Sequence, residues 1–224
     1  MDSNVKKITE TKINNVIRAL EANNMTGIYA PDCAAAIEEV RKLLHDGDTI
    51  SMGGTVTAKE SGVAELIRSD KYNFLDRSAP GITPEQIKEI YTKTFGANVF
   101  VTSTNAVTEN GELYNVDGNS NRVAAMLFGP EKVIVIAGYN KIVPDISSAA
   151  QRVKTIAAPA NCARLNMDTY CNEKGRCVSL NTKNPDFCDG CKSDDRICSN
   201  YTIMSRQRRK GRVFVILVGE ELGY

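Results

Sequence analysis

The densest group of polar side chains lies between Thr102 and Pro130, in the stretch TSTNAVTENGELYNVDGNSNRVAAMLFGP. Two acids in it, Glu109 and Asp117, are candidate catalytic groups, because a carboxylate whose pKa is raised by its pocket can transfer protons. The alternative is that both are solvated turn residues, since each lies just before a glycine turn. Arg122 could grip a carboxylate in bidentate fashion, or it could form a salt bridge at the start of a helix.

A glycine pair forms a second candidate site. Gly53 and Gly54 follow a predicted strand and precede a predicted helix, so backbone N–H groups and the positive end of that helix could face an anion. The alternative is a tight turn with Thr57 capping the helix. The residues predicted to bind a small anionic substrate are Gly53, Gly54, Thr55, Thr57, Asn105, Asn115, Asn121, Arg122 and Lys141.

All cysteines except Cys33 fall between Asn161 and Asn200, where apolar residues are few. Such a segment cannot fold by its own burial, and thiolate coordination of a metal would hold it. Cys188 and Cys191 form a C-x-x-C pair, a common way to present two thiolates to one ion. Zinc and a [4Fe–4S] cluster both accept four thiolates, and the spacing does not separate them. The candidate ligands, of which any four could serve, are Cys171, Cys177, Cys188, Cys191 and Cys198.

Alternating strands and helices must position these groups. The hydropathy pattern predicts helices at 6–20, 33–44, 58–67, 84–95 and 145–156. It predicts strands at 27–30, 48–51, 72–75, 98–101 and 132–137, and two final strands at 201–205 and 213–219 that flank a basic hairpin turn, RQRRKGR. This order indicates an α/β fold with a mostly parallel sheet and flanking helices. Ligands of such sheets bind beyond the carboxyl ends of the strands, so three polar loops, 53–57, 104–122 and 138–141, should converge there.

Composition sets the broad class of the protein. The chain has 224 residues, 42% of them hydrophobic, and a net charge of +1. We expect one α/β domain over 1–224 with a cysteine-rich metal-binding insertion at 161–200. The charge balance gives no case for nucleic acid, and no apolar run is long enough for a membrane span. The polar N-terminal stretch MDSNVKKITETK lacks the apolar core of a signal peptide, so we expect a cytoplasmic protein. In that compartment, seven cysteines favour metal or redox chemistry over structural disulfides.

Three long motifs make the chain recognisable: SMGGTVTAKESGV at 51–63, NAVTENGELYNVDG at 105–118, and NRVAAMLFGPEKVIVIAGYNKIV at 121–143, followed by APAN at 158–161. They resemble the LUD domain family of lactate-utilisation proteins, and the tail resembles its cysteine-bearing branch. An insertion around 179–187 departs from that branch and adds Cys188. The resemblance implies a fold like that of the ribose-phosphate isomerase and CoA-transferase group. It also implies a link to L-lactate oxidation to pyruvate with iron–sulfur partner subunits.

Three functions follow as hypotheses. The first is a metabolic protein that binds a small anionic metabolite and serves a lactate-oxidising iron–sulfur system. The second is an electron-transfer or redox-sensing protein whose active part is the cysteine cluster, which zinc would exclude because zinc has no redox chemistry. The third is a non-catalytic assembly subunit with a vestigial pocket. A homo-oligomer is compatible with each of them.

Overall fold

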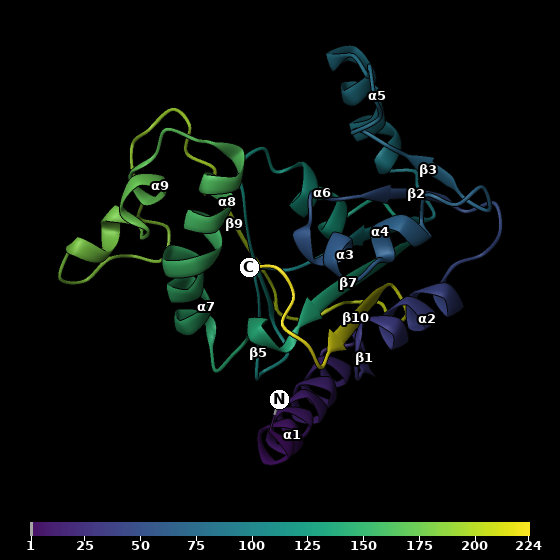
Figure 1. Cartoon of the computed structure of the whole chain (residues 1–224), viewed down its shortest axis with the longest axis horizontal. Helices are drawn as coiled ribbons and strands as arrows, with labels where there is room; N and C mark the ends of the chain where they lie inside the picture. The colour runs from purple at the N-terminus through teal and green to yellow at the C-terminus, as the bar shows by residue number, and fades with distance from the viewer. Residues whose placement is uncertain (1) are drawn as a thin grey trace.

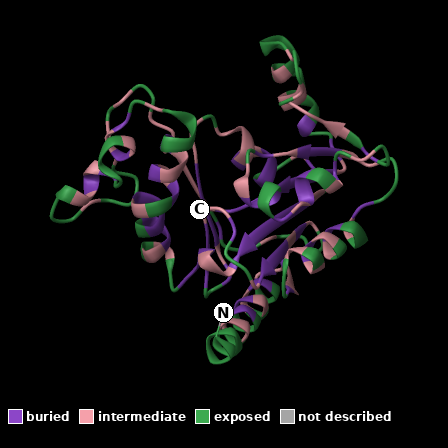
Figure 2. Ribbon diagram, in the orientation of Figure 1, coloured by how far each residue is buried: buried purple, intermediate pink, exposed green. Residues whose placement is uncertain are grey.

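A parallel sheet forms the centre of the protein. The computed structural model describes residues 2–224. Within them, strands β1 (Thr26–Ala30), β10 (Val213–Val218), β7 (Lys132–Gly138), β4 (Val99–Thr102), β2 (Thr49–Met52) and β3 (Asn73–Leu75) lie side by side in that order. Every pairing is parallel. The strands β7 and β10 are the most apolar and lie in the interior of the sheet, as strands buried on both faces should (Figures 1 and 2).

Helices cover both faces of this sheet. Val133, Val135 and Val215 point to one face, where they pack with Ile13 and Val16 of helix α1 (Ser3–Ala22). The alternate residues of the same strands, Ile134, Ile136 and Ile216, form a second core on the opposite face with helix α2 (Cys33–Leu43). The period of two along each strand separates the two cores. This architecture is the predicted α/β fold.

Short helices follow β2 and β3. The predicted helix 58–67 is two helices, α3 (Val56–Glu60) and α4 (Val63–Leu66), because Gly62 between them has a φ of +77°. Thr55, not Thr57, caps α3 by accepting a hydrogen bond from the Ala58 amide at 3.2 Å. Helix α5 (Pro84–Thr94) begins with the capping box of Thr83 and Gln86 and projects from the body (Figure 1).

A second sheet carries the polar centre of the sequence. Its strands are β8 (Ile142–Val143), β5 (Ala106–Thr108), β6 (Leu113–Asp117) and β9 (Asn200–Met204), in that order. Strands β5 and β6 were not predicted, because they are short and lie within a stretch dense in polar residues. The predicted hairpin between the last two strands is wrong: β9 pairs with β6 in this sheet, whereas β10 lies between β1 and β7 in the main sheet. The basic segment 206–212 therefore connects two sheets.

The helix after β8 runs farther than predicted. It comprises α7 (Ile146–Arg152), a π-helical stretch η2 (Val153–Ala157) and α8 (Ala158–Leu165). The π-helical stretch ends just before Pro159, whose missing N–H disfavours a regular α-helical interior. Helices α6 (Asn121–Leu127) and α9 (Tyr170–Lys174) and the 3₁₀ turns η1 (Tyr139–Lys141) and η3 (Val178–Asn181) complete the elements.

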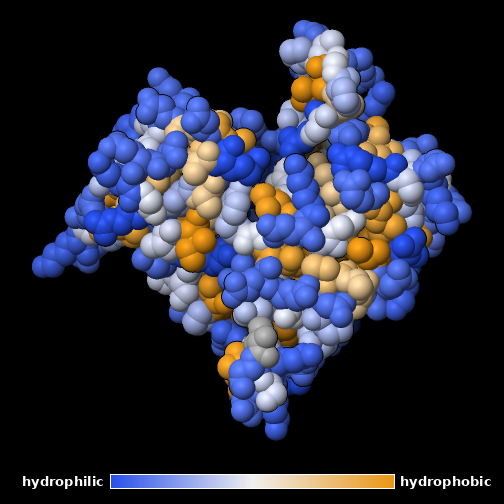
Figure 3. All heavy atoms as spheres, in the orientation of Figure 1, coloured by the Kyte–Doolittle hydropathy of each residue, from blue (hydrophilic) through white to orange (hydrophobic). Residues whose placement is uncertain are grey.

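On the face shown in Figure 3, hydrophilic side chains predominate. Among residues 2–224, no helix combines the length and the apolar character that a bilayer span requires.

Candidate functional site

A cleft of about 550 Å³ lies at the carboxyl ends of the parallel strands. The loops after β2, β3, β4 and β7 contribute Gly54, Arg77, Ser103 and Lys141 to its walls. Helix α8 and the segment 194–197 form the opposite side. The main sheet and the cysteine-rich segment 161–200 therefore both face this cleft.

All three predicted polar loops reach the cleft. The sequence-predicted residues that line it are Gly54, Thr55, Thr57, Asn105, Asp117, Asn121, Arg122 and Lys141. Gly53 and Asn115 do not line it. Gly53 is buried behind Gly54, where an added Cβ would lie 3.1 Å from the Arg122 side chain. The roles of these residues in ligand binding stay a prediction.

Glu109 is the one predicted catalytic acid that lies outside the cleft. It is at the turn between β5 and β6, and its carboxylate pairs with Lys12 of α1 at 2.9 Å in a solvent-exposed ion pair. The position of Glu109 is therefore that of a solvated turn residue, the alternative to a catalytic acid. Asp117 does line the cleft, at the end of β6.

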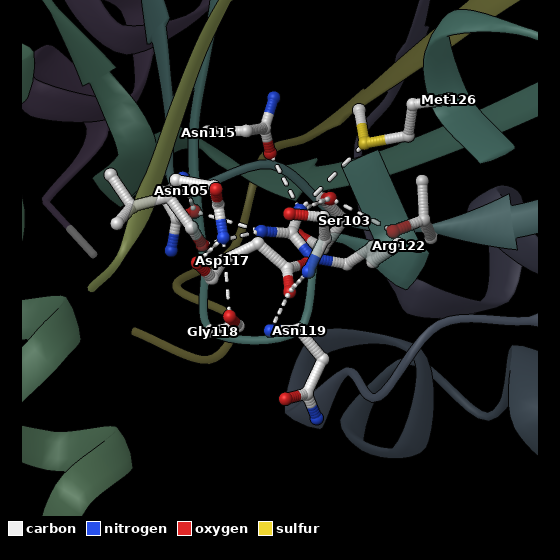
Figure 4. Close-up of polar contacts among 12 residues, drawn as sticks. Ser103, Asn105, Asn115, Asp117, Gly118, Asn119, Arg122 and Met126 are labelled. Atoms are coloured by element: carbon white, nitrogen blue, oxygen red, sulfur yellow. Dashed lines mark hydrogen bonds and ion pairs between the residues drawn. The ribbon is translucent and has the colours of Figure 1, made fainter. Parts of the chain in front are cut away.

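Arg122 organises the floor of the cleft (Figure 4). Its guanidinium donates to the backbone carbonyls of Ser103 and Val116, at 3.2 and 2.8 Å. It also donates to the side-chain oxygens of Asn105 and Asn115, at 3.1 and 2.6 Å. A single side chain therefore ties together the end of β4, strand β6 and helix α6.

Asp117 completes this network. Its Oδ2 lies 3.3 Å from Arg122 Nε, and both side chains are nearly buried, at 13% exposure for Arg122 and 10% for Asp117. Asp117 Oδ1 also accepts from the amides of Asn119 and Ser120. Because a guanidinium has five N–H donors and these contacts use all of them, Arg122 positions the loops and has no N–H left for a ligand.

Lys141 lies deeper, at the end of β7, and is only 2% exposed. Its Nζ donates to Thr57 Oγ1 at 2.8 Å and to Ser103 Oγ at 3.0 Å. Burial, followed by the nearby positive charges of Arg152 and Arg122, lowers the pKa of Lys141 to about 7, and only Glu60 opposes this. A large fraction of Lys141 is therefore neutral near neutral pH.

Two arginines that the sequence reasoning missed also line the cleft. Arg77 follows β3, and an added Cβ on Gly54 would lie 2.8 Å from its Nη2. Arg164 of α8 contacts Asn161 and the hydroxyl of Tyr224. Among residues 2–224, neither forms an ion pair with a carboxylate within 4.0 Å. Their one sequence signal was that each lies in a loop or helix beyond a strand end.

The cysteine segment forms a second, smaller feature. Cys171, Cys177, Cys191 and Cys198 line one cavity of about 20 Å³, and Cys188 does not. Cys162 is buried beside Cys171, with their sulfur atoms 3.5 Å apart. Within residues 2–224, no group of three or more histidine, cysteine or acidic side chains is arranged to hold a metal ion. The structure thus gathers four of the five predicted ligands without forming a compact ion site.

Arg196 holds this segment together. It donates to the backbone carbonyls of Cys198, Cys191 and Cys188, at 3.0, 3.1 and 2.8 Å. Gly190 lies directly against the guanidinium, where a Cβ would be 2.8 Å from the central carbon. Arg196 also lines the large cleft, so the cysteine segment forms part of the cleft wall.

Taken together, the fold and the cleft define an α/β protein with a polar, cation-lined site at the strand ends. The model of the LUD domain matches residues 13–218. The chain therefore belongs to the LUD domain family, which is associated with lactate utilisation.

Solved structures with similar folds are distant in sequence. A DUF162 family protein from Deinococcus radiodurans is 12% identical, with 95% of this chain and 98% of that one covered and a TM-score of 0.42. Ribose 5-phosphate isomerase from Plasmodium falciparum is 15% identical over 50% of this chain and 52% of that one, with a TM-score of 0.32. The eIF2B beta protein from Chaetomium thermophilum is 17% identical over 50% and 43%, with a TM-score of 0.35. No curated protein matches the chain.

Proposed function

We propose that this protein binds a small anionic metabolite in the strand-end cleft and serves the oxidation of L-lactate to pyruvate together with iron–sulfur partner subunits. The observation that carries the proposal is the set of cations around the cleft. Within residues 2–224, Arg77 and Arg164 are cations on its walls without carboxylate partners, and the amine of Lys141 lies at its base. Such cations favour a carboxylate ligand, because charge-assisted hydrogen bonds are stronger than neutral ones.

The surrounding groups suit a hydroxy or oxo acid. The side-chain amides of Asn105 and Asn121, which line the cleft, can donate to a ligand oxygen. Asp117 lies among them, but its carboxylate is held by Arg122 at 3.3 Å. In this proposal Arg122 holds the floor of the cleft rigid, and Arg77 and Arg164 bind the carboxylate of the ligand.

Calorimetric titration with L-lactate and with pyruvate tests this binding. We expect Arg77→Ala and Arg164→Ala each to weaken the affinity for the acid by about tenfold or more, the effect of losing a hydrogen bond to a charged group. Arg18→Ala is the matched control, because Arg18 lies on α1 away from the cleft. If neither acid binds, or if both cleft variants bind as the control does, the proposal is wrong.

A second candidate function, electron transfer, is favoured by the four-cysteine cavity. The donor set there is that of a [4Fe–4S] cluster. In addition, the Tyr114 hydroxyl is buried without a hydrogen-bond partner among residues 2–224, and its pKa is raised to about 12 by burial and then by the charges of Cys188 and Cys198. An orphaned donor near thiols fits a sulfur-rich group that could accept its hydrogen bond. The four cysteine thiols are ligands that a [4Fe–4S] cluster accepts, and such a cluster would supply one-electron redox capacity.

Four of the five candidate cysteines line the cavity, and Cys188 does not. If Cys171, Cys177, Cys191 and Cys198 hold the cluster, then Cys191→Ser should lose iron, sulfide and visible absorbance in protein purified without oxygen. Cys188→Ser, the control, should keep all three. One zinc per chain without colour would make the segment a structural clamp, and loss of iron in both variants would refute the assignment of the four.

A further inference from the structure

The hydrogen bonds of Lys141 suit a neutral amine. Ser103 Oγ donates to Thr57 Oγ1 at 3.3 Å, and Thr57 Oγ1 donates to the Leu222 carbonyl at 3.4 Å. Both hydroxyls therefore have their own protons engaged and act as acceptors toward Lys141 Nζ. Among residues 2–224 they are the only hydrogen-bond acceptors of Nζ. A neutral amine has two N–H groups to donate, whereas an ammonium would be left with a third, buried and unpaired.

The charges around Lys141 also favour its neutral form. Arg152 of α7 and Arg122 of α6 are cationic, while Glu60 of α3 is the acid that opposes them. Glu60 is itself engaged, because its Oε2 accepts from the Gly223 amide at 2.6 Å. No carboxylate within residues 2–224 lies within 4.0 Å of Nζ. Desolvation beside other cations is how a lysine becomes a nucleophile at neutral pH.

We propose that Lys141 is a nucleophilic amine that forms an imine with a small carbonyl acid, a 2-oxo acid, held in the cleft. The proposal rests on the binding proposed above and names the carbonyl compound as the reacting class. The Lys141 nitrogen attacks the carbonyl carbon, and one N–H proton passes to the carbonyl oxygen to give a carbinolamine. Loss of that oxygen as water, with the second N–H proton, leaves a C=N bond.

The residues beside Nζ suit both steps. The Ser103 and Thr57 hydroxyls contact Nζ and each other, so they can relay a proton from the nitrogen to the departing oxygen. Arg77 or Arg164 would hold the carboxylate of the acid. Neither step needs an oxidant, because imine formation from an amine and a ketone releases only water.

Reductive trapping tests the proposal. The full-length protein is incubated with pyruvate and sodium cyanoborohydride, and the modified lysines are located by peptide mass spectrometry. At about pH 7 an ordinary lysine is neutral in fewer than about one molecule in a thousand. We therefore expect Lys141 to be modified at least about tenfold faster than Lys59, an exposed lysine of the adjacent helix α3. L-Lactate, which has no ketone group and cannot form an imine, should slow the reaction by competition.

Two further measurements separate the possible failures. Lys141→Arg replaces the amine with a guanidinium, which cannot form an imine, so it should abolish trapping at this position. Because the site is mapped in the unaltered protein, the test holds even if this variant does not fold. Calorimetry with pyruvate runs in parallel. Binding without modification of Lys141 would overturn the imine and leave the proposed binding intact. Absence of pyruvate binding would overturn the imine, and absence of L-lactate binding as well would overturn the proposed binding. Equal modification of Lys141 and Lys59 would show nonspecific chemistry and also overturn the imine.

Discussion

At the scale of single residues, the nearly buried Arg122 should contribute to the stability of the fold and not to ligand contact. Arg122→Ala leaves Asp117 and several carbonyl oxygens without their shared donor. We expect a loss of about 3–5 kcal/mol in the free energy of unfolding, the usual cost of breaking a buried ion pair. Lys12→Ala removes the exposed pair with Glu109 and should cost about 0–1 kcal/mol. Urea denaturation measures both, and similar losses for the two variants would contradict the central role of Arg122.

The lowered pKa of Lys141 predicts how stability depends on pH. The folded protein releases this proton near pH 7, whereas the unfolded chain holds it until about pH 10. Between these values the unfolded state binds more protons, so the group favours folding increasingly as the pH rises. Lys141→Met removes this linkage. The free energy of unfolding of the unaltered protein, relative to the variant, should rise by at most about 1.4 kcal/mol per pH unit from about pH 7 to about pH 10. A flat difference would show that the lysine is not perturbed.

At the scale of elements, the turn between β5 and β6 fixes the second sheet against helix α1. Gly111 has a φ of +77°, and a Cβ there would lie 2.5 Å from the Ala19 backbone. The Asn23 side chain also donates to the Asn110 and Gly111 carbonyls of this turn. The backbone of the turn thus packs directly against the backbone at the end of α1, and the Asn23 side chain bonds the two together.

Two glycine variants separate backbone conformation from this packing. Gly175 has a nearly equal φ of +72° but nothing within 4 Å of an added Cβ. Gly175→Ala should therefore cost about 1–2 kcal/mol, the strain of a left-handed residue. Gly111→Ala adds the clash with α1, and overpacking typically costs a further 1–3 kcal/mol or so. Thermal unfolding measures the stability of both variants. Equal losses of stability would show that α1 shifts to accommodate the added Cβ without cost.

The elements also show what the sequence could predict. Long apolar runs such as 132–137 and 213–219 identified the interior strands, and the polar loops after them pointed to the cleft. Strands β5 and β6 were missed because they are short and because the sheet is completed by β8 and β9, which are distant in the chain. For the same reason β9 was paired wrongly, since its partner β6 lies far upstream. Arg77 and Arg164 had no local motif, so only the folded chain brings them to the cleft.

At the scale of the whole molecule, the main sheet and the cysteine segment should differ in local stability. Strands β7 and β10 are almost wholly buried, whereas no residue of the described segment 182–199 is buried. Regions with few buried apolar contacts open at low free energy. The Arg196 bonds to three cysteine carbonyls are among the internal contacts that hold this segment.

Hydrogen exchange with and without a bound metal group tests this difference. In metal-free protein we expect the amides of 182–199 to exchange much faster than those of β7 and β10. Reconstitution with iron and sulfide without oxygen should slow exchange in that segment, because a ligand that binds only the folded segment stabilises it by mass action. The sheet strands should change little, and Cys191→Ser should abolish the response that Cys188→Ser keeps. Since Arg196 lines both the segment and the cleft, the cleft residues 194–197 should gain protection together with the cysteines. Protection that spreads evenly over the sheet would instead mean that the metal stabilises the fold globally and that the segment does not open by itself.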